Sequence, residues 1–164
     1  MKRALFIGRF QPFHSAHLKD VKDILKNADE IIIAVGSSNE KNTKENPFSY
    51  NERKKMITSV LKNNNIKDFR ICPVPDLYDD VKWVNYIKTR LPAFDAVYSG
   101  NKWTLRCFDK HNFKIKKIIL IRGISSTKIR DMIAKNKDWK KMVPKDVADY
   151  IKKTNGTERI KKLP

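Results

Sequence analysis

Two histidines three residues apart could bind a phosphate group. His14 and His17 follow Gly8 and Arg9 in the segment GRFQPFHSAH, where a short apolar run gives way to a helical pattern. A spacing of three places both imidazoles on one face of a helix. At a helix start they lie beside free backbone N–H groups and the positive end of the helix dipole, which together suit a phosphate. Ordinary capping or packing histidines are the alternative.

Hydroxyl groups gather at a second predicted helix start. The segment GISSTKIR, residues 123–130, contains Ser125, Ser126 and Thr127. Hydroxyls at such a position normally cap the helix. Arg130 lies one turn further on the same side, from which its guanidinium could reach a phosphate held over the helix end. We interpret this segment as a second candidate phosphate site, with a solvated arginine as the alternative.

Familiar dinucleotide and metal motifs do not explain these segments. The chain has neither GxGxxG nor GxxxxGK[ST] in them. Metalloprotease histidines lie four apart around a glutamate, whereas Ser15 and Ala16 separate these two. Cys72 and Cys107 lack CxxC spacing, so we interpret both as packing residues in a reducing compartment. No residue is predicted to bind a metal.

Short β-branched runs alternate with helical patterns along the chain. Strands are predicted at residues 4–8, 31–35, 69–74, 95–99 and 118–121. Helices are predicted at about 18–25, 49–62, 81–91, from 102, and at 126–135. Ser49 and Glu52 form a capping box at the second of these. The alternation predicts a Rossmann-like, doubly wound α/β fold with a five-stranded parallel sheet.

The length of 164 residues suits one domain, residues 1–164. Residues 138–164 carry apolar side chains at helical spacing among lysines, which predicts a C-terminal helical appendage on the sheet edge, with Gly156 as a helix stop. The polar segment Ser37–Phe48 is the longest predicted loop. Long loops beside the carboxyl edge of a sheet are often lids or binding loops.

Charge and hydropathy narrow the classes of partner. Thirty-six Lys and Arg against eighteen Asp and Glu give a net charge of +18, which favours anionic partners such as nucleotides, nucleic acid or acidic membranes. The apolar run after Lys2 and Arg3 is too short for a signal peptide, and no run of eighteen apolar residues occurs. We therefore expect a cytoplasmic protein with no membrane partner.

Several segments together resemble a known family. GRFQPFHSAHL is similar to the HxxH element of the nucleotidyltransferase superfamily, and ISSTKIR to its second signature. ENPFSYNER at 45–53, VPD at 74–76, WV at 83–84 and VYSGN at 97–101 extend the similarity to archaeal-type nicotinamide mononucleotide adenylyltransferases. The ordered matches cover nearly the whole chain.

The resemblance implies transfer of AMP from ATP to the 5′-phosphate of nicotinamide mononucleotide (NMN), giving NAD and pyrophosphate by direct in-line attack. It implies catalytic roles for Arg9, His14, His17 and Arg130. The implied ATP contacts are Gly8, Arg9, Phe10, His14, His17, Ser125, Ser126, Thr127 and Arg130. Mg²⁺ is expected with ATP, held mainly by phosphates and water because no carboxylate cluster marks a site. The family is commonly homo-oligomeric.

The acceptor pocket is the most specific expectation. Asp76, Trp83, Val84 and Asn101 fall where the family contacts the acceptor and nucleoside. Helical spacing predicts an inward stripe of Val81, Val84 and Ile87, which leaves the Trp83 ring free to stack on a pyridinium. The Asp76 loop would then read the carboxamide, so we predict preference for the amide mononucleotide over its acid counterpart.

Two other classes remain open from the sequence. Ala16 replaces the family's usual glycine, and Ser126 replaces the glycine of the SGT common in archaeal members. Adenylyl- or cytidylyltransferases with another acceptor, such as phosphopantetheine, therefore remain alternatives. The charge and the interspersed aromatics Trp103, Phe108 and Phe113 keep a nucleic-acid-binding protein as the rival class, although no RNA or DNA motif is present.

Overall fold

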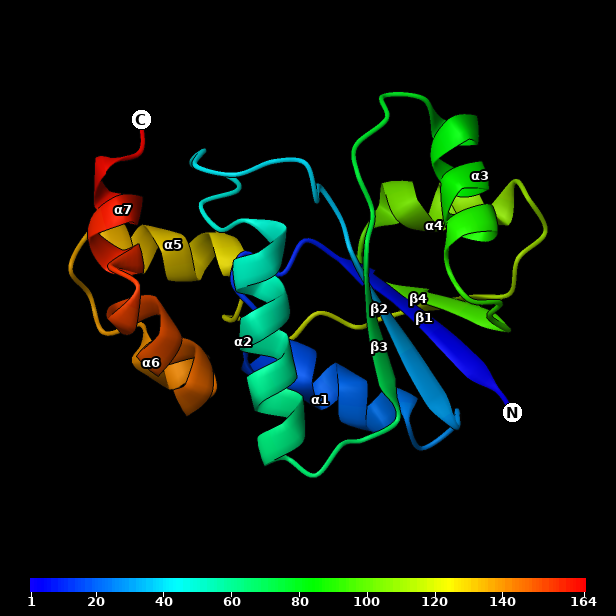
Figure 1. Ribbon diagram of the computed structural model, residues 1–164, viewed down its shortest axis with the longest axis horizontal. Coiled ribbons are helices and arrows are strands. Elements are labelled where there is room, and N and C mark those ends of the chain that lie inside the picture. The colour runs from blue at the N-terminus through cyan, green and yellow to red at the C-terminus, as the bar shows by residue number, and fades with distance from the viewer.

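Five parallel strands form a single sheet in the computed structural model, which describes residues 1–164 (Figure 1). The strands are β1 (Arg3–Gly8), β2 (Glu30–Val35), β3 (Phe69–Pro73), β4 (Ala96–Ser99) and β5 (Ile115–Lys117). Their order is β3-β2-β1-β4-β5, so the chain leaves β1 in one direction and later returns to its other side. This reversal creates a topological switch point between β1 and β4, where open α/β sheets bind ligands.

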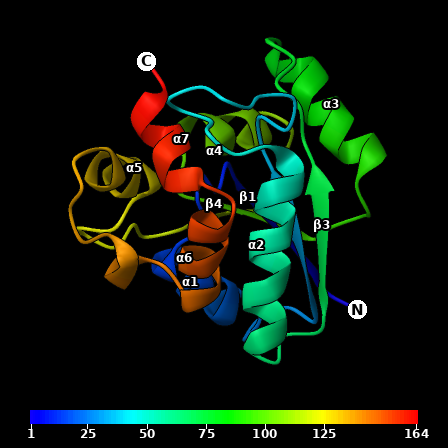
Figure 2. The ribbon, with the colours of Figure 1, turned by 60° about the vertical axis from the view of Figure 1, so that its left-hand side comes forward.

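Helices cover both faces of the sheet (Figures 1 and 2). They are α1 (Ser15–Ile24), α2 (Tyr50–Asn63), α3 (Asp80–Arg90), α4 (Lys102–Asp109), α5 (Ser126–Ala134), a 3₁₀ turn (Lys140–Met142), α6 (Lys145–Lys153) and α7 (Gly156–Lys162). Successive side chains of a strand point to opposite faces. Phe6 of β1 thus joins a core of 23 residues with α1 and α2, whereas Ile7 joins a core of 12 with α3 and α4. The doubly wound fold is confirmed.

The start of α2 forms as predicted. Ser49 Oγ accepts from the backbone N–H of Glu52, and Glu52 Oε2 accepts from the backbone N–H of Ser49 at 2.8 Å. This capping box satisfies N–H groups that lack partners within the helix. It fixes where the long loop from Ser37 ends and where α2 begins.

The prediction of a fifth strand at 118–121 is wrong. The chain instead pairs Ile115–Lys117 with Val97–Ser99. Ile119 and Leu120 are 86% and 74% exposed, and both lie outside the strand. The apolar run misled the prediction because Ile118, Leu120 and Ile121 line a cavity. Their hydrophobicity reflects that position and not burial within the sheet.

The C-terminal appendage is helical, but it does not cover the sheet edge. Helix α6 packs on α2, and α7 packs on both α5 and α6. Gly156 begins α7 instead of stopping a helix, because Asn155 makes the turn with a left-handed φ of 56°. No helix is both long enough and apolar enough to cross a membrane.

Candidate active site

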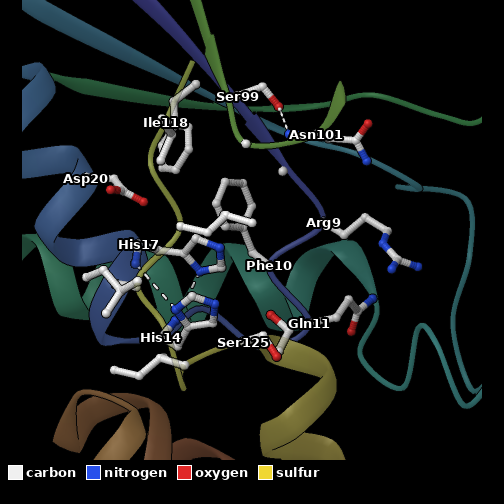
Figure 3. A pocket seen from close by; sticks show the side chains of 18 of the residues that line it. Arg9, Phe10, Gln11, His14, His17, Asp20, Ser99, Asn101, Ile118 and Ser125 are labelled. Carbon is white, nitrogen blue, oxygen red and sulfur yellow. Dashed lines mark hydrogen bonds between the residues drawn. The ribbon is translucent and has the colours of Figure 1, made fainter. Parts of the chain in front are cut away.

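A cavity of about 320 Å³ lies at the carboxyl ends of β1 and β4. Its walls come from the turn after β1, the start of α4, and the segment from 118 to the first turn of α5. Arg9, just after β1, and Asn101, just after β4, mark the two sides of the switch point (Figure 3). The fold therefore brings together two segments, residues 8–17 and 123–130, that the sequence separates by more than one hundred positions.

His14 and His17 cap one another at the start of α1. The backbone N–H of His17 donates to His14 Nδ1 at 3.4 Å, and the backbone N–H of His14 donates to His17 Nδ1 at 3.2 Å. Their rings stack with centroids 3.5 Å apart. This is a capping box built from two imidazoles, so the capping interpretation is confirmed, and the phosphate-binding role of the pair stays a prediction.

The protonation of the pair follows from this geometry. Burial lowers the pKa of His14 to about 4, and burial together with His14 holds the pKa of His17 well below its usual value. Both rings are therefore neutral at pH 7. Because each Nδ1 accepts an N–H, the single ring proton of each histidine belongs on Nε2. The cavity wall thus carries two uncharged N–H donors.

Aromatic side chains support the histidines from behind. The Phe10 ring meets the His17 ring edge to face at 4.8 Å, and Phe6 and Phe13 lie on either side. Phe10 is 1% exposed and has a left-handed φ of 53°. A Cβ on Gly8 would lie 2.9 Å from Phe10 Cζ, so only glycine fits there. Phe10, an expected ATP contact, thus packs mainly against His17.

Arg130 joins α5 to the turn after β1. Its Nη1 donates to the carbonyl of Gln11 at 2.9 Å, and its Nη2 donates to Thr127 Oγ1 at 3.4 Å. Ser126 Oγ donates to the carbonyl of Pro12 at 2.9 Å, while Ser125 caps α5. Burial, with the nearby Arg9 cation, lowers the pKa of Arg130.

The expected ATP residues therefore gather, with one exception. Gly8, Arg9, Ser125, Ser126 and Arg130 all line the cavity with the two histidines. Thr127 is exposed and does not line it. Its hydroxyl instead accepts from Arg130, which helps fix the orientation of the guanidinium.

Gln11 and Arg53 hold the site but were not singled out in the sequence. The Gln11 side chain accepts from the Phe48 N–H at 3.0 Å and donates to the Phe48 carbonyl at 2.8 Å. Arg53 is fully buried, and its guanidinium donates to the carbonyls of Arg9, Gly36 and Ser37. Burial lowers the pKa of Arg53 to about 10, so it stays charged at pH 7.

Nothing in residue type distinguishes these two supports before folding. Gln11 lies between the two phenylalanines of GRFQPFH, and Arg53 is one of 36 basic residues. A buried arginine is rare unless its donors are satisfied. The only available signal was their place inside motifs already noted, because their partners are backbone N–H and carbonyl groups of other loops.

Asp20 is the one acidic residue that lines the cavity. Burial raises its pKa to about 6. In Figure 3, Asp20 and Arg9 lie on opposite sides of the histidine pair. The cavity is thus cationic toward Arg9 and Arg130 and anionic toward Asp20. No group of three or more His, Cys, Asp or Glu side chains could hold a metal ion.

The expected acceptor residues divide between two places. Asn101 caps α4 and lines the main cavity. Asp76 and Trp83 line a separate cavity of about 130 Å³, together with Trp103. Val84 is fully buried in the second core, so its side chain serves packing.

The predicted inward stripe of α3 is confirmed at Val84 and Ile87 but wrong at Val81 and Trp83. Val81 is 56% exposed, whereas Trp83 is 4% exposed and packs against Trp103 and Phe108. The buried face of α3 consists of Trp83, Val84 and Ile87. Trp83 is thus a core residue whose side chain also lines the small cavity.

Comparison with known proteins gives the class. Residues 5–132 match the family model described as cytidylyltransferase-like. A bifunctional NMN adenylyltransferase/ADP ribose pyrophosphatase from Francisella tularensis, solved with AMP and Mn, has the same fold at a TM-score of 0.73 and 24% identity, over 94% of this chain and 53% of that one. A putative nicotinate-nucleotide adenylyltransferase from Vibrio parahaemolyticus matches at 0.69 and 17%, over 99% and 98%. Fold and family model together define a nucleotidyltransferase.

Relatives in sequence narrow the class. Nicotinamide-nucleotide adenylyltransferase from Methanococcus aeolicus is 39% identical, over 98% of this chain and 94% of the relative. The enzyme of the same name from Pyrococcus furiosus is 37% identical, over 99% and 89%. The chain belongs to the nicotinamide-nucleotide adenylyltransferase family.

Proposed function

We propose that the cavity between β1 and β4 is where AMP passes from ATP to the 5′-phosphate of NMN, forming NAD and pyrophosphate. An oxygen of the acceptor phosphate bonds to the α-phosphorus, and the bond from that phosphorus to the bridging oxygen of pyrophosphate breaks. Alignment and charge stabilisation supply the catalysis, without a covalent enzyme intermediate. The observation that carries the proposal is the neutral histidine pair, which shares one cavity with Arg130.

His14 and His17 stabilise the charge on the reacting phosphoryl group. Each offers an Nε2–H whose direction is fixed by the reciprocal caps. Donors held in place before the reaction require little reorganisation as charge develops. A neutral ring also avoids the repulsion that an imidazolium would experience from the nearby cations Arg9 and Arg130.

Arg130 and the start of α5 receive the β- and γ-phosphates. The bond from Nη1 to the Gln11 carbonyl fixes the guanidinium plane, and its remaining N–H groups can reach phosphate oxygens. Ser125 Oγ accepts from the Lys128 N–H and so keeps its own proton to donate, whereas Ser126 donates to the Pro12 carbonyl and holds the turn in place. The first backbone N–H groups of α5 add further donors and the helix dipole. Arg9 is exposed at the mouth and adds a mobile positive charge.

An Mg²⁺ ion bound with ATP would neutralise part of the phosphate charge. The cavity offers a single carboxylate, Asp20, so the protein itself provides no oxygen cage for the ion. Mg²⁺ commonly keeps several waters and binds through substrate phosphates. The donor set is therefore compatible with an ion held mainly by ATP and water.

The acceptor's nicotinamide ring occupies the small cavity. The Trp83 and Trp103 indoles line it, and the face of an indole attracts a cationic ring. The Asp76 carboxylate lies at the same cavity, where it would accept from a carboxamide N–H and repel a carboxylate. Asn101, which lines the main cavity, lies two residues before Trp103, which lines the small one.

A direct assay tests the function. Purified protein with ATP, Mg²⁺ and NMN should release NAD and pyrophosphate in equal amounts, measured by chromatography and a coupled pyrophosphate assay. Reactions without acceptor, with phosphopantetheine, and with CTP in place of ATP are the controls. Turnover with phosphopantetheine or CTP but not with NMN and ATP would overturn the proposal.

A second assay tests the acceptor pocket. The protein should use NMN in preference to its acid counterpart, and Asp76→Asn should reduce that preference by lowering the repulsion of the acid. Asp79→Asn, at the same small cavity and at the cap of α3, is the matched control. Equal use of both acceptors by the unmodified protein would show that Asp76 does not read this group.

A further inference from the structure

The C-terminal helix contacts the loop that precedes α2. Figure 2 shows α7 beside the upper end of α2. Arg159 of α7 donates through Nη2 to Glu52 Oε1 at 2.7 Å and through Nη1 to Glu52 Oε2 at 2.9 Å. Nη1 also approaches the carbonyl of Pro47 at 3.3 Å. The guanidinium lies 5.4 Å from the centre of the Phe48 ring, in cation–π range.

Glu52 is a shared partner of two helices. Its Oε2 already accepts from the Ser49 N–H in the capping box of α2. Burial alone would raise the pKa of Glu52, but hydrogen bonds from Arg159 and Ser49 hold it below its usual value. Two N–H bonds to one carboxylate form a planar fork that fixes the relative position of the two groups. Helix α7 is thus joined to the start of α2 through a defined geometry.

Phe48 carries this connection toward the active site. Its side chain is fully buried and belongs to the same core cluster as Phe13 and Ile160. A Cβ on Gly156 would lie 3.0 Å from Phe48 Cε1, so α7 packs as closely as a glycine allows. The Phe48 backbone is bonded on both sides by the Gln11 amide. The carbonyl of Gln11 in turn accepts from Arg130.

These contacts form one continuous path from the tail to the phosphate-binding residues. We propose that Arg159 is a positioning residue, which sets the Phe48 loop and, through Gln11, the orientation of Arg130 and the turn that carries the histidines. We call the contacts of Arg159 with Glu52, Pro47 and Phe48 the C-terminal latch. The latch never touches substrate, so its effect on the reaction passes entirely through Gln11.

Two further observations favour a role in the site over a general role in stability. Residues 133–164 lie outside the cytidylyltransferase-like model, whereas the nicotinamide-nucleotide relatives match 98–99% of the chain. The molecule also has a second half-buried ion pair, Arg3 with Glu30, a glutamate that Arg70 binds as well, at the amino end of β1 and far along the strand from the cavity. The Arg3–Glu30 pair shows that an ion pair can stabilise this fold without any contact to Gln11.

Arg3 provides the matched control. Its side chain is 30% exposed against 25% for Arg159, and each arginine binds a mostly buried glutamate. Both Arg159→Ala and Arg3→Ala should lower the melting temperature by a few degrees. We expect Arg159→Ala to lower kcat about tenfold per folded molecule, as loss of donor alignment does elsewhere, while Arg3→Ala stays within about twofold. Equal activity of the two variants would overturn the latch.

A double-mutant cycle separates positioning from simple destabilisation. If Arg159 acts through Gln11, then Gln11→Ala combined with Arg159→Ala should be no slower than Gln11→Ala alone. If the fold-loss in kcat of the double variant equalled the product of the losses in the two single variants, Arg159 would not act through Gln11. Arg159→Lys covers the case in which the alanine variant does not fold, because one ammonium cannot reproduce the fork. Its kcat should also fall, and full activity would refute the proposal.

The positioning role of Arg159 rests on the proposed function only because its test measures NAD formation. Absence of NAD formation by the unmodified protein would count against the function. NAD formation at a normal rate by Arg159→Ala, with the protein folded by circular dichroism, would count against the latch alone.

Discussion

At the scale of single residues, His14 and His17 cannot be treated as separate catalytic groups. Each Nδ1 is occupied by the other's backbone N–H, so each ring is both a helix cap and a donor. The same bonds select the tautomer that presents Nε2–H to the cavity. Capping usually competes with function as an explanation for a residue at a helix start, but here it provides the geometry that function needs.

Replacement of His17 should reduce turnover more than ATP affinity. His17→Ala removes one fixed donor to the reacting group, so we expect kcat to fall about a hundredfold or more while the KM for ATP changes less. His17→Gln, which can still donate and accept, should recover part of the loss. Steady-state kinetics checks both. An unchanged kcat in folded His17→Ala would leave the pair with a packing role only.

The lowered pKa of His14 makes stability depend on pH. The folded state binds this proton less tightly than the unfolded state, so stability is lost as pH falls from 6.5 toward 4. The full shift corresponds to about 3 kcal/mol. His14→Asn keeps a good cap but does not titrate. Urea unfolding at pH 7 and pH 4.5 should show a smaller loss for this variant, and an equal loss would contradict the assignment.

At the scale of elements, the loops after β1 and β2 depend on one buried side chain from α2. Arg53 satisfies the carbonyls of Arg9, Gly36 and Ser37, which no strand or helix pairs otherwise. The guanidinium carries several donors in a fixed fork, so it suits three acceptors that converge from two loops. Helix α2 thereby fixes the separation of the two strand ends beside the cavity.

Arg53→Met should therefore be strongly destabilising. It leaves the carbonyls of Arg9 and Gly36 without partners, whereas the Ser37 carbonyl still accepts from the Glu40 N–H. At about 1–3 kcal/mol for each lost partner, we expect a loss of about 2 kcal/mol or more in the free energy of unfolding. Lys54→Met, the exposed neighbouring position, is the control and should change it little. Chemical denaturation measures both. A loss below 1 kcal/mol for Arg53→Met, by that same scale, would mean that water replaces the guanidinium.

Sequence periodicity predicts elements well where burial is uniform and poorly where a ligand site interrupts it. Residues 31–35 are all buried, so a β-branched run there can only be a central strand. Residues 118–121 are equally apolar but line the cavity, which periodicity cannot distinguish from a strand. The inward face of α3 was predicted correctly at Val84 and Ile87, but Trp83 replaces Val81 on it because the Trp83 ring packs against Trp103 and Phe108, contacts that periodicity does not show.

The candidate site was predictable only in part for a related reason. Residue type and helix-start position identify His14, His17 and Arg130, because their chemistry is local. Gln11 and Arg53 act on backbone groups of distant loops, so their roles exist only after the chain has folded. Residues that bind the backbone of distant loops cannot be recognised from their type or spacing in a single sequence.

At the scale of the whole molecule, the net charge of +18 agrees with a polyanionic substrate pair. Most of these cations are remote from the cavity, where only Arg9 and Arg130 line the wall. Remote charges act through the long-range field, which raises the encounter rate of anions but does not align them. Charge alone therefore indicated an anionic partner but could not distinguish nucleotides from nucleic acid.

The distance of most cations from the cavity predicts how salt should affect the kinetics. Ions screen exposed charges over a Debye length of about 10 Å at 0.1 M. We expect kcat/KM for ATP to fall about tenfold between 20 mM and 500 mM salt, because steered association is lost, while kcat changes much less. The double variant Lys54→Glu and Lys55→Glu lies on the exposed face of α2 and lowers the net charge by four without touching the cavity. It should show a shallower salt dependence at unchanged kcat. Equal salt dependence in both proteins would assign the effect to Arg9 and Arg130 alone, since local contacts, and not the summed field, would then set the rate of association.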